Sequence, residues 1–249
     1  EHPEMEAFKD MKMRMSEIIG RWTVGNEDRS TPVPNLLFFR REKPMPPAIC
    51  MVEPSVVFVV QGVKQMLVGG EAYPYNISRF LVTSLDLPAN SEVIEASPEK
   101  PCLGFVLKLD LRIVAELIAH GGLPFPTERS DDKGVCIGLG KVTPALLQPF
   151  RRMLDLLDEP GAIPVLAPLI AREIHYRLLM SDQAARLWQI ASVGSQGHRV
   201  AKAIDWLKAN YTATLRIDDL AARVQMSTSS LHQYFRQLTA MSPLQYQKW

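Results

Sequence analysis

Seven short runs of β-forming residues follow one another between Thr31 and about Asp110, and no long helical segment separates them. Glycine and proline clusters typical of turns divide the runs, at Gly69-Gly70, Pro88-Ala89-Asn90 and Pro98–Pro101. This spacing predicts an antiparallel barrel or sandwich, which is a natural container for a small ligand. The predicted strands are Leu36–Phe39, Ile49–Val52, Val56–Val60, Lys64–Val68, Phe80–Ser84, Glu92–Ala96 and Cys102–Leu109.

Helical periodicity flanks this β-rich region on both sides. An amphipathic helix is predicted over residues 6–22, and a short helix over Leu111–His120. Thr143, an N-cap followed by proline, begins a third helix, and a fourth begins near Ala167-Pro168. The third and fourth helices could form an antiparallel hairpin whose outer face pairs with a second copy of the chain, or could only cover the barrel.

The stretch Leu215–Leu238 predicts a helix-turn-helix. Apolar residues recur at helical spacing in its first half, Gln225-Met226 interrupts them, and Ser227 stands where an N-cap begins a second helix. In this motif the second helix enters the DNA major groove. Its apolar residues, which would face inward, are Leu231, Phe235 and Leu238. Its outward residues are the candidate DNA-binding residues: Thr228, Ser229, His232, Gln233 and Arg236.

These five outward residues divide into two expected roles. Ser229, His232 and Gln233 are placed to reach base edges, and the glutamine suits adenine, whereas the other two are better placed for phosphate. The alternative is a solvated helix in an all-α subdomain, because Gln225 occupies a turn position where many such motifs have glycine.

Positive charge is concentrated in the last part of the chain. Residues 198–249 hold seven Lys or Arg and three Asp, a net charge of +4. The whole chain has a net charge of only +1, so residues 1–197 carry −3. This asymmetry favours a polyanion-facing surface in the C-terminal part, although charge alone is equally consistent with a solvated face.

Residues that could catalyse a reaction or bind a metal are sparse. Cys50, Cys102 and Cys136 have neither the paired spacing of a disulfide framework nor a CxxC pattern, which indicates a reducing compartment. The pair Asp131-Asp132 has no recognisable acid–base partner. We therefore expect no catalytic residue, no metal and no cofactor. The histidines all lie outside the β-rich region: His2, His120, His175, His198 and His232.

The chain has no segment that predicts a membrane location. No apolar run approaches the roughly 18 residues of a membrane span, and no signal-peptide core is present. We expect a cytoplasmic protein without a membrane partner. The first residue is Glu1 rather than methionine, which indicates a processed or engineered segment.

An unidentified small-molecule effector is expected in the β-rich unit. Tyr73 and Tyr75 follow the Gly-Gly turn and could contact a ligand near a barrel mouth, or could simply pack in the sheet. Cys50 and Cys102 could sense electrophiles or oxidants, or could be inert small hydrophobes in strands. Together with Phe58, these are the candidate effector-binding residues.

The run from Arg216 to Trp249, RIDDLAARVQMSTSSLHQYFRQLTAMSPLQYQKW, resembles the first half of the DNA-binding domain of AraC-type transcriptional regulators. The resemblance includes Leu220-Ala221, Met226-Ser227, Phe235 and the SPLQYQK run from Ser242 to Lys248. Three upstream segments resemble the N-terminal effector domain of one branch of that family: QGVK at Gln61–Lys64, LVTSLDLP at Leu81–Pro88 and SPEKP at Ser97–Pro101.

This resemblance implies a cupin-like N-terminal barrel that binds a small molecule and helices that mediate dimerisation. It also implies two helix-turn-helix units joined by a long helix. The joining helix would start near Pro243 and the chain ends at Trp249, so we expect the second unit to be missing. One unit alone should bind DNA weakly and with strong salt dependence.

We therefore expect an α+β chain made of five parts. They are an N-terminal helical arm (1–30), a cupin-like effector-binding barrel (31–141), a helical hairpin for dimerisation (142–181), a linker (182–197) and a truncated all-α helix-turn-helix unit (198–249). Within the linker, a short helix is predicted around Ala184–Ile190. The expected function is ligand-responsive transcription regulation rather than catalysis. Expected partners are double-stranded DNA, a small-molecule effector, a second copy and RNA polymerase. The alternatives are a cupin-type barrel enzyme with a fused helical domain and a thiol-based sensor of electrophiles or oxidants.

Overall fold

The computed structural model describes residues 2–126 and 135–249. Helices in this part of the chain are α1 (Pro3–Trp22), α2 (Leu111–His120), α3 (Pro144–Asp155), α4 (Ile163–Leu179), α5 (Ala184–Ala191), α6 (Gln196–Ala209), α7 (Ile217–Arg223), α8 (Thr228–Thr239) and α9 (Pro243–Gln247). Strands are β1 (Asp28–Ser30), β2 (Leu36–Arg41), β3 (Met45–Val52), β4 (Ser55–Gln61), β5 (Val63–Val68), β6 (Glu71–Tyr75), β7 (Arg79–Thr83), β8 (Leu87–Glu95), β9 (Cys102–Lys108) and β10 (Ile137–Lys141). The seven predicted strands are confirmed, whereas β1, β6 and β10 were not predicted.

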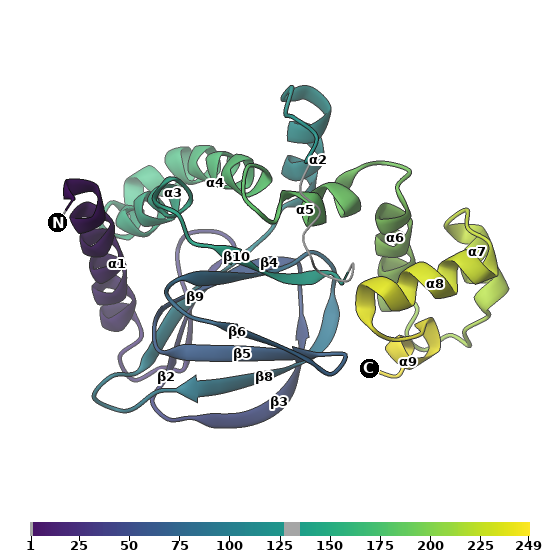
Figure 1. The fold of residues 1–249 in the computed structure, drawn as a ribbon, viewed down its shortest axis with the longest axis horizontal. Coiled ribbons are helices and arrows are strands. Elements are labelled where there is room, and N and C mark those ends of the chain that lie inside the picture. The colour runs from purple at the N-terminus through teal and green to yellow at the C-terminus, as the bar shows by residue number, and fades with distance from the viewer. Residues whose placement is uncertain (1, 127–134) are drawn as a thin grey trace.

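The strands form two antiparallel sheets that face each other (Figure 1). One sheet has the order β1-β2-β9-β4-β7-β10, and the other has the order β3-β8-β5-β6. The predicted α+β class is confirmed, but the β unit is a sandwich and not a closed barrel. The consecutive strands β4 and β5 belong to different sheets because the chain turns sharply at Gly62, where φ is 89°. A Cβ at Gly62 would come within 2.7 Å of the Glu95 carbonyl oxygen, so only glycine fits this corner.

The larger sheet is buried on both faces. Helices α1, α3 and α4 cover its outer face, and the smaller sheet covers its inner face (Figure 1). Along β4, Val56, Phe58 and Val60 belong to the outer core under the helices. Val57 and Val59 belong to the interior between the sheets. This arrangement explains why β4 is a continuous apolar run rather than an alternating one.

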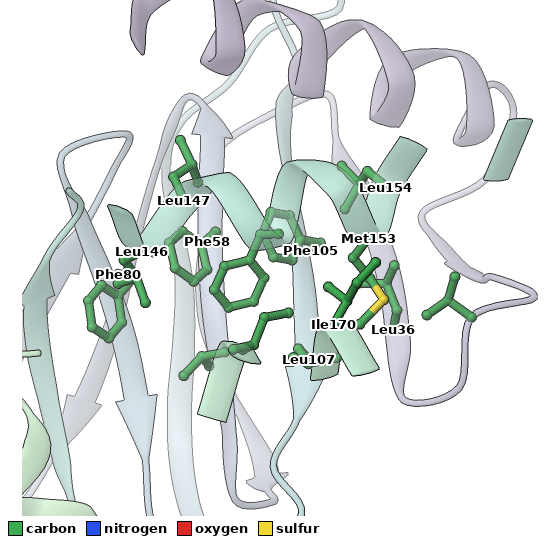
Figure 2. Packing of buried hydrophobic residues seen from close by; sticks show 14 of the residues in the cluster. Leu36, Phe58, Phe80, Phe105, Leu107, Leu146, Leu147, Met153, Leu154 and Ile170 are labelled. Carbon is green, nitrogen blue, oxygen red and sulfur yellow. The ribbon is translucent and has the colours of Figure 1, made fainter. Parts of the chain in front are cut away.

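Phe58 is the centre of the outer core. Its ring stacks on Phe80 and Phe105, which lie beside it in Figure 2, with centroid distances of 5.2 Å and 5.1 Å. The ring of Phe150 on α3 lies 4.6 Å from it. Replacing a fully packed phenylalanine by alanine typically costs about 3–5 kcal/mol. Phe58 therefore holds α3 on the sheet.

The start of β8 corrects one prediction. The segment Pro88-Ala89-Asn90 was predicted as a turn, but β8 begins at Leu87 and runs through it. β5 pairs with β8 only from Asn90 onward, so at Pro88 the strand has β3 as its neighbour on one side alone. A proline is tolerated there because its missing N–H removes no bond to a second neighbour.

The two helices after β10 lie over the larger sheet, which both predicted arrangements allow. Thr143 is the N-cap of α3, as predicted, and its hydroxyl accepts from the Leu146 N–H at 3.3 Å. α4 begins at Ile163 rather than near Ala167-Pro168, because Pro164 stands in its first turn, where proline is pre-organised for a helix. α3 and α4 lie together over the outer face of the sheet (Figure 1).

Helices α6 to α9 form a C-terminal helical unit at one end of the sandwich, beside the β5–β6 turn (Figure 1). Four apolar residues at helical spacing on α6 are buried: Val200, Ala203, Ile204 and Leu207. The unit follows α5 closely, since a Cβ at Gly197 would lie 2.5 Å from the Gln189 carbonyl oxygen. The chain therefore passes from α5 into α6 with the two helices in contact.

Candidate functional site

Helix α7, the following turn and helix α8 lie where the helix-turn-helix was predicted. Gln225 adopts a left-handed backbone in the turn, with φ of 59°, which glycine would adopt with less strain. The Met226 N–H donates to the Ala221 carbonyl at 2.9 Å and closes the turn. The Ser227 hydroxyl accepts from the Ser230 N–H at 3.1 Å, so the predicted N-cap is confirmed.

Helix α8 has one buried and one exposed face. The three residues predicted to face inward are buried: Leu231, Phe235 and Leu238. Four of the five candidate DNA-binding residues are exposed: Ser229, His232, Gln233 and Arg236. Their spacing of i, i+3, i+4 and i+7 places them in one stripe along the helix, which we call the recognition face. Gln237, which the sequence did not single out, is exposed on the same helix.

Thr228, the fifth candidate, differs from the other four. It is partly buried, and its hydroxyl donates to Asp218 Oδ1 at 3.0 Å. The bond ties the first turn of α8 to α7. Since the carboxylate beside Thr228 would repel a phosphate, the phosphate contact predicted for this residue stays a prediction without support from the geometry.

The C-terminal helical unit packs on the sandwich through one continuous apolar cluster. That cluster joins side chains from both sheets with side chains from α5 to α9. Gly69, in the β5–β6 turn, lies so close to Ala240 that a Cβ on Gly69 would be 2.7 Å from the Ala240 Cβ. Ala240 follows the last turn of α8, so the C-terminal end of this helix meets the sandwich (Figure 1). Its N-terminal end points away.

Asp86 is the polar centre of this contact. It is only 8% exposed. Its carboxylate accepts from Lys208 Nζ at 2.9 Å, and its backbone carbonyl accepts from the Tyr246 hydroxyl at 2.8 Å. The Cys136 N–H donates to the Leu238 carbonyl at 2.9 Å. We call these three hydrogen-bonded contacts, together with Gly69 against the end of α8, the docking interface.

The candidate effector-binding residues lie in different parts of the sandwich. Tyr75 and Cys102 are buried between the two sheets, and Tyr73 packs against the same cluster. Cys50 is exposed on the edge strand β3, yet lies near enough to Tyr75 for its charge to affect the pKa of that tyrosine. Phe58 lies in the outer core, where its side chain contacts α3 rather than the interior.

The thiols are poorly suited to redox or electrophile sensing. Burial raises the pKa of Cys102 to about 11 and that of Cys136 to about 12. Burial also raises the pKa of Cys50. The thiolate is the reactive form of cysteine, so all three thiols are in their unreactive form near neutral pH. The geometry does not favour the thiol-based alternative.

Side chains that could hold a metal ion do not gather in the described part of the chain. Among residues 2–126 and 135–249, no three His, Cys, Asp or Glu side chains are placed to hold a metal ion. Asp131-Asp132 lies outside the described residues. His175 is buried, and its Nε2 accepts from the Asp110 N–H at 3.0 Å while its Nδ1 lies 2.6 Å from the Ala171 carbonyl. These backbone contacts give His175 a structural role. No helix in the described ranges is long and apolar enough to cross a membrane.

A family model described as the AraC-type transcriptional regulator N-terminus matches residues 32–186. This match covers more than half of the 249 residues. The chain belongs to this family. The AraC-type match begins just before β2 and ends within α5, so it includes most of the sandwich and the helices that cover it. The predicted resemblance to AraC-type regulators is confirmed.

Several solved structures resemble this AraC-type chain at low sequence identity. An apo structure of a ToxT variant from Vibrio cholerae is 9% identical, with a TM-score of 0.36, and the match covers 88% of this chain and 99% of that one. Unsaturated fatty acid-bound ToxT from the same organism is 10% identical, with a TM-score of 0.36 and coverage of 86% and 93%. The AraC-like activator CuxR is 13% identical, with a TM-score of 0.40 and coverage of 81% and 70%. Comparison with curated proteins finds no match.

Proposed function

We propose that this AraC-type chain is a ligand-responsive transcription regulator that binds double-stranded DNA through α8 and a small-molecule effector through the sandwich. The observation that carries the proposal is the docking interface, where the end of α8 and the sandwich share one apolar cluster. A ligand that changes the packing between the sheets would therefore shift the population of orientations of α8. On this proposal the chain acts on DNA in the cytoplasm and catalyses no reaction.

The recognition face supports the DNA-binding part of the proposal. Ser229, His232 and Gln233 are exposed in the first half of α8, which points away from the sandwich. The first half of a recognition helix is the part that contacts base edges in this class of motif. Arg236 is exposed one turn further on, where its guanidinium suits a phosphate.

Substitutions on the recognition face test this assignment. His232→Ala and Gln233→Ala should each relax base preference, at about 1–3 kcal/mol per lost base contact. Arg236→Ala should weaken binding to all sequences alike and reduce the salt slope by about 1. Selection from a random duplex library, followed by fluorescence anisotropy at several salt concentrations, measures both effects. Lys100→Ala, an exposed cation on the sandwich, is the control. Identical changes in all three variants would remove the assignment of roles.

The outer side of α4 supports a second copy as partner. Val165 and Leu169 are 67% and 63% exposed, and Leu166 is 39% exposed beside them. A hollow of about 410 Å³ lies next to these side chains, between α3 and α4. Exposed apolar side chains grouped on one helix are typical of a protein–protein contact, and a twofold symmetric pair is the commonest arrangement.

A charged substitution on the outer side of α4 tests whether the chain forms a dimer through this surface. Leu169→Glu should convert a dimer into a monomer in light-scattering measurements of molar mass, because a carboxylate cannot be buried against apolar side chains without a partner. Leu244→Glu, at an exposed leucine of α9, is the matched control. An unchanged dimer in Leu169→Glu would contradict the use of this surface. Contact with RNA polymerase stays a prediction with no surface assigned to it.

A further inference from the structure

One lysine faces the space between the two sheets. Strand register places Met45, Val93, Lys64 and Tyr75 side by side across β3, β8, β5 and β6. Directly opposed residues in antiparallel strands share a face, and Val93 and Tyr75 are buried in the interior cluster. The Lys64 side chain therefore points between the sheets. We call these four residues the Lys64 row.

A second row faces the Lys64 row from the larger sheet. Arg41 and Cys102 are opposed across β2 and β9, and Cys102 is buried in the same interior cluster. Phe39, two residues before Arg41, places its ring centroid 4.5 Å from Lys64 Nζ. Two cations, an aromatic ring and the Tyr75 hydroxyl thus lie around one end of the sandwich interior.

The positive charges here are not fully balanced. Arg41 is paired, because its guanidinium donates to Asp28 Oδ1 at 3.0 Å and to the Glu27 carbonyl at 2.6 Å. For Lys64 the described residues place no carboxylate within the 4.0 Å that defines an ion pair. Burial lowers the pKa of Lys64, and the charge of Arg41 lowers it further. An ammonium that is partly withdrawn from water, with an aromatic ring but no carboxylate beside it, is incompletely compensated and is suited to pair with an anionic ligand.

A hollow of about 500 Å³ lies beside Arg41. Its lining includes Arg41 from the larger sheet and Met45 from the Lys64 row. Glu27, Glu42 and Lys43 also line it, so the hollow opens beside the end of the two rows that holds Arg41 and Met45. It is large enough for a small organic molecule, whose typical sites measure about 300–1,000 Å³.

We propose that Lys64 and Arg41 bind the carboxylate of a small effector, with the apolar body of that molecule in the hollow against Met45. One uncompensated ammonium matches one carboxylate, and the Tyr75 hydroxyl can donate a further hydrogen bond. This inference rests on the proposed function and specifies the chemical class of its effector. β5 runs from Lys64 to Val68, directly before Gly69, and β8 begins at Leu87, directly after Asp86, and reaches Val93, so both strands join this site to the docking interface.

Ligand binding measured without DNA tests the inference. Octanoate and benzoate should raise the thermal midpoint of the protein and give saturable heats in calorimetry, whereas octan-1-ol and benzamide should do neither. Lys64→Met keeps the length of the side chain and removes its charge, so it should weaken carboxylate binding roughly 10- to 100-fold. Lys100→Met, at an exposed lysine outside the site, should leave binding unchanged.

The ligand-free stability of Lys64→Met separates binding from a structural role. Loss of an unpaired ammonium from the interior should raise the thermal midpoint by roughly 2–4 °C. A lower midpoint would mean that Lys64 stabilises the fold through Phe39, and would overturn the inference. Failure of both carboxylates to bind, or equal binding by Lys64→Met, would also overturn it. None of these results bears on DNA binding by α8, which the recognition-face variants test separately.

Discussion

His175 gives the chain a specific dependence of stability on pH. It is 2% exposed, and its Nε2 accepts the Asp110 N–H, so the imidazole is neutral in the folded state. Burial lowers the pKa of His175, partly opposed by the Ala171 carbonyl and the Asp110 charge. The unfolded chain, with an ordinary histidine pKa of about 6.5, binds a proton there that the folded chain does not. Stability from this residue is therefore lost as pH falls below about 6.5.

Urea denaturation at about pH 7.5 and about pH 5.5 checks this dependence. The free energy of unfolding of the wild type should be lower at the lower pH than at the higher pH. At the higher pH, His175→Gln should be less stable than the wild type, because the Asp110 N–H loses the acceptor that His175 provides. On acidification, the free energy of unfolding of His175→Gln should decrease less than that of the wild type. His198→Gln is the control, since burial also lowers the pKa of His198 but far more of that residue is exposed. An equal acid loss in His175→Gln and the wild type would contradict the assignment.

Single residues differ in how far their roles could be predicted. The N-caps at Thr143 and Ser227 were predictable because a cap depends on local sequence. The position of Phe58 was not, because β4 is apolar on both faces and the sequence does not say which face meets the interior. Lys64 did leave a signal: it shares an alternating face with Met66 and Val68 in β5, where a charge among apolar neighbours is unexpected.

At the scale of elements, the β5–β6 turn contacts the end of α8 through only one of its two adjacent glycines. Alanine at these two positions should therefore destabilise the chain to different extents. Gly69 and Gly70 both have positive φ, of 56° and 80°, so alanine at either position strains the backbone by about 1–2 kcal/mol. A Cβ on Gly69 would also meet Ala240, whereas nothing lies within 4 Å of a Cβ on Gly70. Gly69→Ala should therefore destabilise the chain more than Gly70→Ala does.

A double-mutant cycle isolates the contact with α8. Ala240→Gly removes the opposing Cβ and also relieves a left-handed alanine with φ of 62°. In the Ala240→Gly background, Gly69→Ala should lower the free energy of unfolding no more than Gly70→Ala does, as measured by urea denaturation. Additive effects of Gly69→Ala and Ala240→Gly would show that the turn and the helix end do not touch in solution.

Elements with strong local periodicity were predicted well, and those fixed by tertiary pairing were not. α2 was predicted with its observed bounds, because its apolar spacing and the following Gly121-Gly122 are local signals. β6 contains Pro74, which counts against a strand, yet β6 is the last strand of its sheet and tolerates the missing N–H. β10 contains two glycines and is held by pairing with β7, which no local pattern reveals.

At the scale of the molecule, the family was accessible from the sequence, but the docking interface was not. Asp86 lies in a run of apolar residues and contacts Lys208 and Tyr246, more than a hundred residues later. No spacing rule connects such positions. The linker predicted over residues 182–197 contains α5, which confirms the short helix predicted there around Ala184–Ile190, and its Leu187 and Ile190 are buried.

The docking interface predicts that the sandwich and the C-terminal helical unit unfold together. They share one apolar cluster, so breaking either exposes part of the other. Tyr246→Phe removes a buried hydrogen bond, typically worth about 1 kcal/mol. Lys208→Met removes an ion pair whose lysine is half exposed, which screening reduces to about 0–1 kcal/mol. The double variant should lower the free energy needed to open the C-terminal helical unit by about 1–2 kcal/mol.

Native-state hydrogen exchange measures this loosening. In the wild type, amides of Val200–Leu207 in α6 and of Val56–Val60 in β4 should exchange with similar free energies, because the shared cluster makes them open together. In the double variant the α6 amides should exchange at lower free energy while the β4 amides keep theirs. Tyr211→Phe with Arg216→Met, at exposed positions of the same unit, should change neither. Separate opening of α6 already in the wild type would mean that the cluster does not join the two parts, and that a ligand between the sheets has no route to α8.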